Sequence, residues 1–106
     1  MPPKEELTLG RRLLVTLEDV NALIPKAKSA AQLKMLKDSR KKLLEQIGIL
    51  VDSNLDSASE EYRAATLGLQ EASTSIRDAL KDMENVAKAI ELLAKAVDLV
   101  AKVAAA

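Results

Sequence analysis

The sequence predicts an all-α fold, an antiparallel helical bundle, and three features of its composition predict it. Ala, Leu, Lys and Glu, the strongest helix formers, are abundant, whereas strands favour aromatic and β-branched residues and the chain has one aromatic residue, Tyr62. Three Gly and three Pro are too few for the turns between many short strands. A chain of 106 residues that is 48% hydrophobic has the size and apolar content of one folded domain, so residues 1–106 are expected to form a single helical-bundle domain.

The first helix is expected over residues 4–24. Pro2 and Pro3 precede it, and Pro is favoured at the first helical position. Pro25 disfavours helical geometry at the residue before it and so marks the end. Gly10 weakens the first turns, and residues 1–5 are expected to fray. One apolar stripe follows the helix at spacings of four, three and four residues: Leu13, Leu17, Val20 and Ile24.

The second helix is expected over residues 29–52. Ser29 and Gln32 form a capping box, in which Ser29 is the N-cap and the Gln32 side chain reaches back. Arg40 interrupts the apolar stripe, and its aliphatic stem is expected to pack while its guanidinium reaches a carboxylate. The stripe itself comprises Leu33, Leu36, Leu43, Ile47 and Leu50.

The third segment, residues 57–104, carries the strongest periodic signal. Ser57 and Glu60 form a second capping box at its start, and residues 105–106 are expected to fray. A heptad pattern then runs without a skip, which predicts one long helix with a coiled-coil seam. The residues at position a are Tyr62, Leu69, Ile76, Met83, Ile90, Val97 and Ala104, and those at position d are Ala65, Ala72, Ala79, Val86, Leu93 and Val100.

Two arrangements of these helices remain open. The unbroken heptad favours three helices, of which the last is long; the alternative is a compact four-helix up-down bundle with a break near Ser75, which could cap a helix with Asp78. In either case, helices two and three are expected to form an antiparallel hairpin that turns at Asn54. That pairing would place Lys37 near Glu71.

The residue types argue against an enzyme and against a metal or cofactor site. The chain has no His and no Cys, which are the commonest general base, metal ligand and activated nucleophile. The acids Asp78, Asp82 and Glu84 lack the Glu-x-x-His pattern of di-iron bundles, and there is no Gly-rich phosphate loop. We therefore expect a non-catalytic protein with no catalytic, cofactor-binding or metal-binding residues.

The last helical turns point to association with another helical protein. From residue 84 onward the segment is apolar around most of its circumference, so it needs burial on several sides. The interpretation is an interaction or structural protein acting through coiled-coil-type self- or hetero-association, with a homo-dimer favoured. On this view Ile90→Asp would dissociate the oligomer. The candidate interface residues are Met83, Val86, Ile90, Leu93, Val97 and Val100.

The alternative function uses the basic stretch of the second helix, residues 34–42, to bind anionic lipid or nucleic acid reversibly. A net charge of zero and the lack of aromatic residues for base stacking argue against nucleic acid, and the lack of Trp and Phe anchors argues against peripheral membrane contact. No signal peptide or transmembrane run is present, which predicts a cytoplasmic protein and leaves non-classical export open. The candidate anion-contact residues are Lys34, Lys37, Arg40, Lys41 and Lys42.

Overall fold

The computed structural model describes residues 8–50 and 59–105, and these form a bundle of four α-helices packed against each other. The expected all-α helical bundle is therefore confirmed. Two short 3₁₀ turns, η1 (Ile24–Lys26) and η2 (Met83–Asn85), lie after α1 and before α4. The four helices are α1 (Leu9–Leu23), α2 (Ala30–Leu50), α3 (Glu60–Lys81) and α4 (Val86–Ala105).

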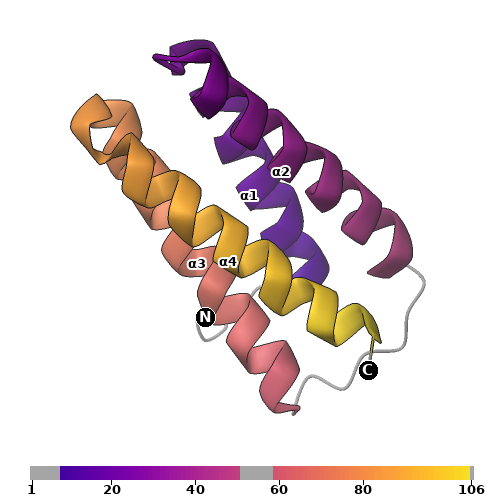
Figure 1. Ribbon diagram of the computed structural model, residues 1–106. Coiled ribbons are helices and arrows are strands. Elements are labelled where there is room, and N and C mark those ends of the chain that lie inside the picture. Colours follow the sequence, from indigo (N-terminus) through magenta and orange to yellow (C-terminus); the bar gives the residue numbers. More distant parts are fainter. Residues whose placement is uncertain (1–7, 51–58, 106) are drawn as a thin grey trace.

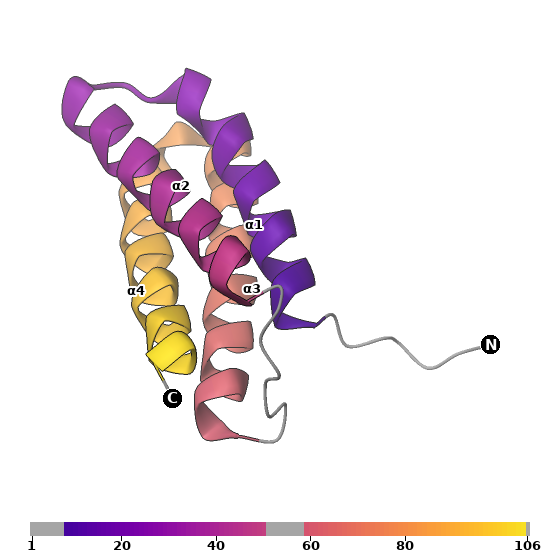
Figure 2. The same ribbon diagram turned by 90° about the vertical axis from the view of Figure 1, so that its right-hand side faces the viewer.

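The helices form two layers, each an antiparallel hairpin (Figures 1 and 2). One layer holds α1 and α2, and the other holds α3 and α4. Between the layers, α1 packs on α3 and α2 packs on α4. α1 and α3 run parallel, because Leu9 meets Tyr62 near the start of both helices and Thr16 meets Ser73 further along, about two turns on in α1 and three turns on in α3.

The start of α1 is fixed from two sides. The hydroxyl of Thr8, the N-cap, accepts a hydrogen bond from the backbone N–H of Arg11 at 3.2 Å. The backbone N–H of Leu9 donates to the phenol oxygen of Tyr62 on α3 at 2.9 Å. The first N–H groups of a helix have no partner inside the helix, so the single aromatic residue of the chain caps α1 as well as packing against the core. Residues 4–7 of the expected first helix lie outside the described residues.

Ser29 caps α2 as predicted, and the Gln32 side chain reaches back as expected, but to the residue before the cap. The hydroxyl of Ser29 accepts from the backbone N–H of Gln32 at 3.1 Å, and the Gln32 amide oxygen accepts from the N–H of Lys28 at 3.0 Å. Further along α2, Arg40 is half-buried and donates to the amide oxygen of Asn21 on α1 at 3.4 Å. Its expected partner was a carboxylate, and the structure gives it a neutral amide instead.

The N-cap of α3 differs from the prediction. Ser59, which precedes Glu60, accepts a hydrogen bond from the backbone N–H of Tyr62 at 3.2 Å. Ser57, the predicted cap, lies outside the described residues, as does the predicted turn at Asn54. Ser57 and Ser59 both have the hydroxyl group that an N-cap needs, and α3 begins after Ser59.

The prediction of one long helix over 57–104 was wrong, because the chain turns at Asp82. Asp82 is extended (φ −142°, ψ 105°), and its carboxylate accepts from the backbone N–H of Glu84 at 3.0 Å. Such local side-chain bonds compete with helix continuation. The alternative break near Ser75 was also misplaced, since Ser75 is buried within α3. A heptad pattern shows which face of a helix is buried, but it does not show whether the helix is continuous. The four residues that connect α3 to α4 leave the seven-residue spacing of the apolar residues unchanged, so the pattern continues across the turn.

The predicted hairpin between the second and third helices was also wrong. In the structure α2 packs on α1 and α4 and lies diagonally across the bundle from α3. Lys37 and Glu71 are therefore not opposite each other. The pairing was inferred from complementary charges, but exposed ion pairs contribute only about 0–1 kcal/mol each. Burial of apolar side chains between the layers is worth far more and decides which helices are neighbours.

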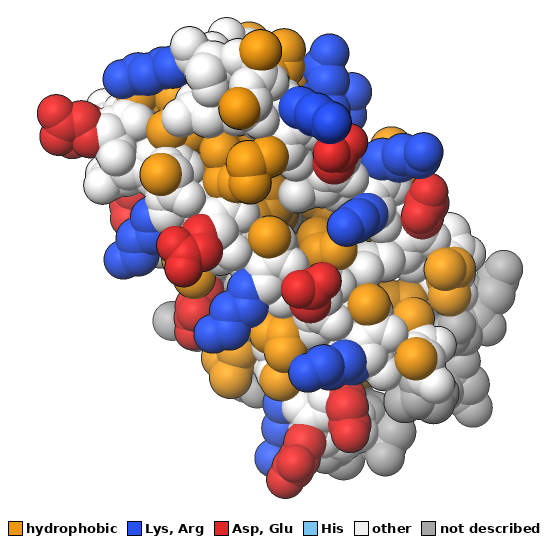
Figure 3. Space-filling model, viewed as in Figure 1, with side chains coloured by type: hydrophobic (Ala, Val, Ile, Leu, Met, Phe, Trp, Pro, Cys, Tyr) orange, Lys and Arg blue, Asp and Glu red, His pale blue; other side chains and the backbone are white. Residues whose placement is uncertain are grey.

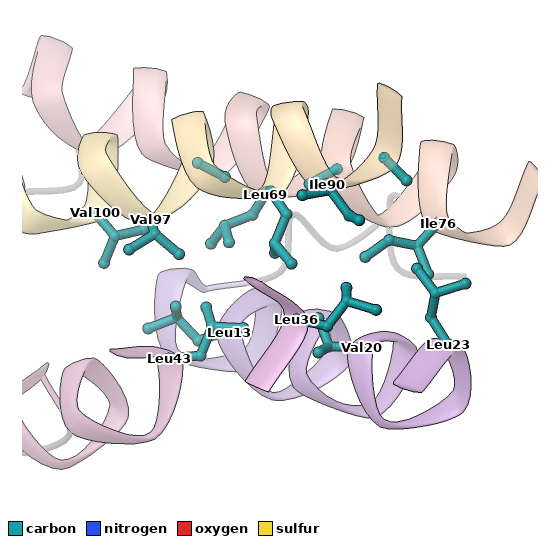
Figure 4. Packing of buried hydrophobic residues seen from close by; sticks show 14 of the residues in the cluster. Leu13, Val20, Leu23, Leu36, Leu43, Leu69, Ile76, Ile90, Val97 and Val100 are labelled. Atoms are coloured by element: carbon teal, nitrogen blue, oxygen red, sulfur yellow. The ribbon is translucent and has the colours of Figure 1, made fainter. Parts of the chain in front are cut away.

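The core lies between the two layers (Figure 4). Side chains of α3 and α4 point toward those of α1 and α2. Residues at the predicted heptad positions supply most of the core side chains that come from α3 and α4. Eight leucine and isoleucine side chains of the described residues are fully buried there: Leu9, Leu13, Leu23, Leu36, Leu43, Leu69, Ile76 and Leu93.

Candidate functional site

Five of the six predicted interface residues lie in the core of the chain's own bundle. Leu93 and Val100 are fully buried, and Val86, Ile90 and Val97 are 4% exposed. Met83, the sixth, lies in the turn before α4 and packs partly against the core. The structure places the five α4 residues along one face of that helix, which packs against α2 and α3 rather than facing solvent.

This placement changes what a substitution at Ile90 would do. An aspartate at a position that is 4% exposed would place a charge in the core, and a buried unpaired charge destabilises the fold itself. Ile90→Asp would therefore not separate loss of association from loss of folding. A surface for association has to be sought on the outer faces of the helices.

The five predicted anion-contact residues are all on α2, and four of them face solvent. Lys34, Lys37, Lys41 and Lys42 are exposed, whereas Arg40 is half-buried and bonded to Asn21. Within residues 8–50 and 59–105, no ion pair joins these lysines to an acid. On the side of the molecule seen in Figure 3, basic side chains are interspersed with acidic and apolar ones and form no continuous basic patch.

A groove that was not predicted runs along the outer side of the α3–α4 hairpin. It consists of two adjoining hollows of about 560 and 300 Å³, which share Leu67, Glu71 and Leu92. Leu67 is 59% exposed, the largest exposure among the large hydrophobic residues described. Leu92 and Leu99 from α4 are half-buried and complete the apolar floor, with Ala64 and Gly68 from α3.

The two rims of this α3–α4 groove carry opposite charge. Glu71 and Asp78 stand on the α3 rim, and Lys88 and Lys95 stand on the α4 rim. All four side chains are exposed, and none forms an ion pair within 4 Å among the described residues. The groove therefore presents an apolar floor between an acidic edge and a basic edge, with all four charges open to an external group.

Gly68 leaves room for a leucine side chain of α4 beneath the groove. A Cβ at this position would lie 2.8 Å from Cδ1 of Leu99 and 3.5 Å from Cα of Ala96. The glycine thus lets the side chain of Leu99 lie across α3. This contact also fixes the register of the antiparallel pair, with residue 68 level with residue 96.

One sequence signal could have indicated this groove. In the heptad, Leu67 falls at f, the outermost position, where the last helix has lysine throughout; Leu92 and Leu99 fall at c, also off the seam. Leucines off the seam of a predicted coiled coil are candidates for a second apolar face. The sequence alone does not show that c residues of one helix and an f residue of another lie side by side, because that requires the chain to reverse at Asp82.

In the described part of the chain, no group of three or more acidic, His or Cys side chains is placed to hold a metal ion. The same residues contain no helix with the length and apolar character needed to cross a membrane. No protein-family model, no curated protein and no solved structure matches the chain.

Proposed function

We propose that this protein is a helical interaction protein that self-associates through the α3–α4 groove. The observation that carries the proposal is the apolar floor of Leu67, Leu92 and Leu99 between two rims of opposite charge. Scattered exposed leucines are normal on a protein surface, but leucines gathered in a groove with a polar rim are typical of interaction sites. The occupant that fits this rim is a second copy of the same chain.

The charges support a two-fold arrangement. If the two-fold axis runs parallel to the helices, the acidic α3 rim of one copy lies against the basic α4 rim of the other. In the antiparallel pair, residue 68 is level with residue 96, so Glu71 is level with residue 93. Lys95 is two residues from that level, which is about 3 Å along the helix axis. The same count places Asp78 within two residues of Lys88. Each dimer would then form four complementary pairs, whereas an axis across the helices would oppose like charges.

The area of the hairpin face is adequate for a weak or moderate dimer. α3 has 22 residues and is therefore about 33 Å long at about 1.5 Å per residue. Two helices about 9 Å apart, each about 10 Å wide, span about 19 Å. The face thus offers about 600 Å² per chain, slightly below the roughly 800 Å² per partner of a standard interface.

The test is the molar mass in solution, measured by light scattering with refractive-index detection because Tyr62 is the only aromatic chromophore. The wild-type chain should approach twice its 11.4 kDa mass as concentration rises. Leu67→Gln should raise the dimer dissociation constant by about ten-fold or more, since a two-fold interface counts the lost leucine twice. Leu44→Gln is the matched control, because Leu44 is 53% exposed on α2, away from the groove.

A charge reversal separates this arrangement from general apolar adhesion. Lys95→Glu should weaken the dimer, and adding Glu71→Lys in the same chain should restore it, because the rims remain complementary after the exchange. A wild-type chain that stays at 11.4 kDa at all concentrations, or equal effects of the Leu67 and Leu44 substitutions, would rule the proposal out. Circular dichroism of each variant checks that it remains helical.

A second candidate function uses the exposed lysines of α2 on a polyanion or an anionic membrane. The supporting observation is that four lysine side chains on one helix face solvent without an acidic partner among the described residues. Binding of this kind weakens steeply as salt rises. Sedimentation with anionic lipid vesicles at low and high salt, using Lys37→Gln/Lys41→Gln as the variant, tests it; no binding at low salt would exclude the lipid-binding function.

A further inference from the structure

A second cavity lies on the other side of α3, between α3 and α1, and its lining is mostly polar. Its volume is about 230 Å³. Three lining residues come from α1 and five from α3, and the two helices run parallel here. The lining residues are Arg12, Val15, Thr16, Leu69, Gln70, Ser73, Thr74 and Arg77. Two arginines on neighbouring helices thus border one cavity.

Arg12 has an unused donor at this cavity. Its Nε is buried from solvent and has no hydrogen-bond partner among the described residues. A buried guanidinium N–H that lacks an acceptor is unfavourable, and more so than a neutral donor. Since nearly all buried polar groups in proteins find a partner, this orphaned N–H points to an acceptor that residues 8–50 and 59–105 do not supply.

Arg77 also has N–H groups that can bind an added ligand. Its Nε lies 3.5 Å from Oδ2 of Asp19, an ion pair whose acceptor oxygen makes no hydrogen bond. The Arg77 side chain is 61% exposed, so its guanidinium has N–H groups to direct toward an added ligand. Among the described residues, Arg12, Arg77 and Asp19 together give the cavity a net charge of +1.

The hydroxyl groups at the cavity floor add a further donor. Oγ1 of Thr16 and Oγ of Ser73 lie 3.0 Å apart and are both buried. Each hydroxyl has one proton, and the bond between them uses one, so the second proton remains to be donated. Thr74 and Gln70 supply another hydroxyl and an amide at the same lining.

We propose that this Arg12–Arg77 cavity binds a phosphate group, either as free inorganic phosphate or as a phosphomonoester. Planar guanidinium groups match phosphate oxygens with paired N–H donors, and charge-assisted bonds of this type are about twice as strong as neutral ones. A tetrahedral oxyanion can accept from two arginines and a hydroxyl at once, whereas a planar carboxylate offers only two oxygens. At about 30 Å³ per water molecule, the cavity has room for the anion and for part of a substituent.

The test is a titration of the ¹⁵N-labelled protein with inorganic phosphate and, separately, with phenyl phosphate, at constant ionic strength against chloride. The chain has five arginines, so each Nε–H gives a signal that can be assigned. We expect saturable shifts of the Arg12 and Arg77 Nε–H signals with either compound. The compound that binds more tightly identifies whether free phosphate or a phosphomonoester is the better ligand.

Matched variants make the result specific. Arg12→Gln and Arg77→Gln should each weaken phosphate binding by about ten-fold or more, because each removes charge-assisted bonds. Arg11→Gln is the control, since Arg11 is exposed, adjacent in sequence and absent from the cavity lining. Should Arg12→Gln impair folding, Arg12→Lys keeps the charge and removes the Nε–H donor, and it should also weaken binding.

Two results would overturn the proposal. One is the absence of saturable shifts at Arg12 with both compounds. The other is an equal loss of binding in Arg11→Gln and Arg12→Gln, which would show attraction to the general surface charge instead of a site. The signals report on single residues, so they are independent of whether the chain dimerises through the α3–α4 groove.

Discussion

The contact between Gly68 on α3 and the Leu99 side chain on α4 allows a sharp test of the packing. Glycine inside a helix is about 1 kcal/mol less favourable than alanine, so Gly→Ala should stabilise wherever the new methyl group has room. Gly48 on α2 has nothing within 4 Å of an added Cβ. Gly48→Ala should therefore stabilise the protein, and the gain in a helix interior is about 0.5–1 kcal/mol. We expect the lower value here, because Gly48 lies in the last turn described for α2.

Gly68→Ala should behave differently. The added Cβ would lie 2.8 Å from Cδ1 of Leu99, so the end of that leucine side chain has to move, while Cα of Ala96 at 3.5 Å stays at an ordinary contact distance. Forcing an extra carbon into a packed contact costs about 1–3 kcal/mol. Because only the end of the half-buried Leu99 side chain has to move, the cost lies toward the lower end of that range. After the gain in helix propensity, the net effect should lie between about zero and a loss of about 1 kcal/mol.

A double-mutant cycle isolates the contact. In a Leu99→Ala background the obstructing atom is gone, so Gly68→Ala should become stabilising by up to about 1 kcal/mol. The interaction energy between positions 68 and 99 should therefore be about 1 kcal/mol or more. Urea unfolding followed by circular dichroism gives these free energies, and it should be run at low protein concentration because association through the groove adds apparent stability.

One result would refute the reasoning. If Gly68→Ala stabilised the wild-type chain as much as Gly48→Ala does, and if positions 68 and 99 were additive, Leu99 would not lie across α3 at that position. The thermal midpoint offers an independent check, because 1 kcal/mol corresponds to about 4–8 °C for a domain of this size.

Three further outcomes are expected. Ile90→Asp should largely abolish the cooperative thermal transition seen by circular dichroism, rather than yield a folded monomer, because position 90 is 4% exposed. Thr16→Val and Ser73→Ala should each destabilise by about 1–3 kcal/mol in urea unfolding, while the double variant should cost less than the sum of the two, because the 3.0 Å hydroxyl pair leaves an orphan only when one member is removed. Gln46→Leu should be close to neutral or stabilising in the same assay, since it removes a 2.9 Å bond to the carbonyl of Val97 together with a buried amide oxygen that has no partner among the described residues.

The sequence was a reliable guide to properties that belong to a single helix. The cap by Ser29 and the reach back of the Gln32 side chain were predicted correctly because their hydrogen bonds join residues three or four apart. The heptad also identified the buried side of both later helices, including Leu69, Ile76 and Leu93. A repeat near the helical period places its residues on one face wherever that face is buried.

The surfaces argued to be functional depend on which helices are neighbours. The α3–α4 groove needs the reversal at Asp82, which brings Leu67 beside Leu92. The phosphate cavity needs α1 and α3 to lie parallel, so that Arg12 and Arg77 line one space. Neither juxtaposition leaves a periodic trace in the sequence, because the residues are separated by 25 or more positions and come from different helices.

The sequence by itself therefore determined that the chain is helical, where α2 begins and which faces of the later helices are buried. Only the tertiary structure decided that the heptad segment is two helices, that α2 lies beside α4 instead of α3, and that the apolar face of α4 is consumed by the chain's own core. The physical reason is that helix formation and facial burial follow from local spacing. The choice of neighbours follows from the packing of whole layers, in which many alternatives satisfy the same local pattern.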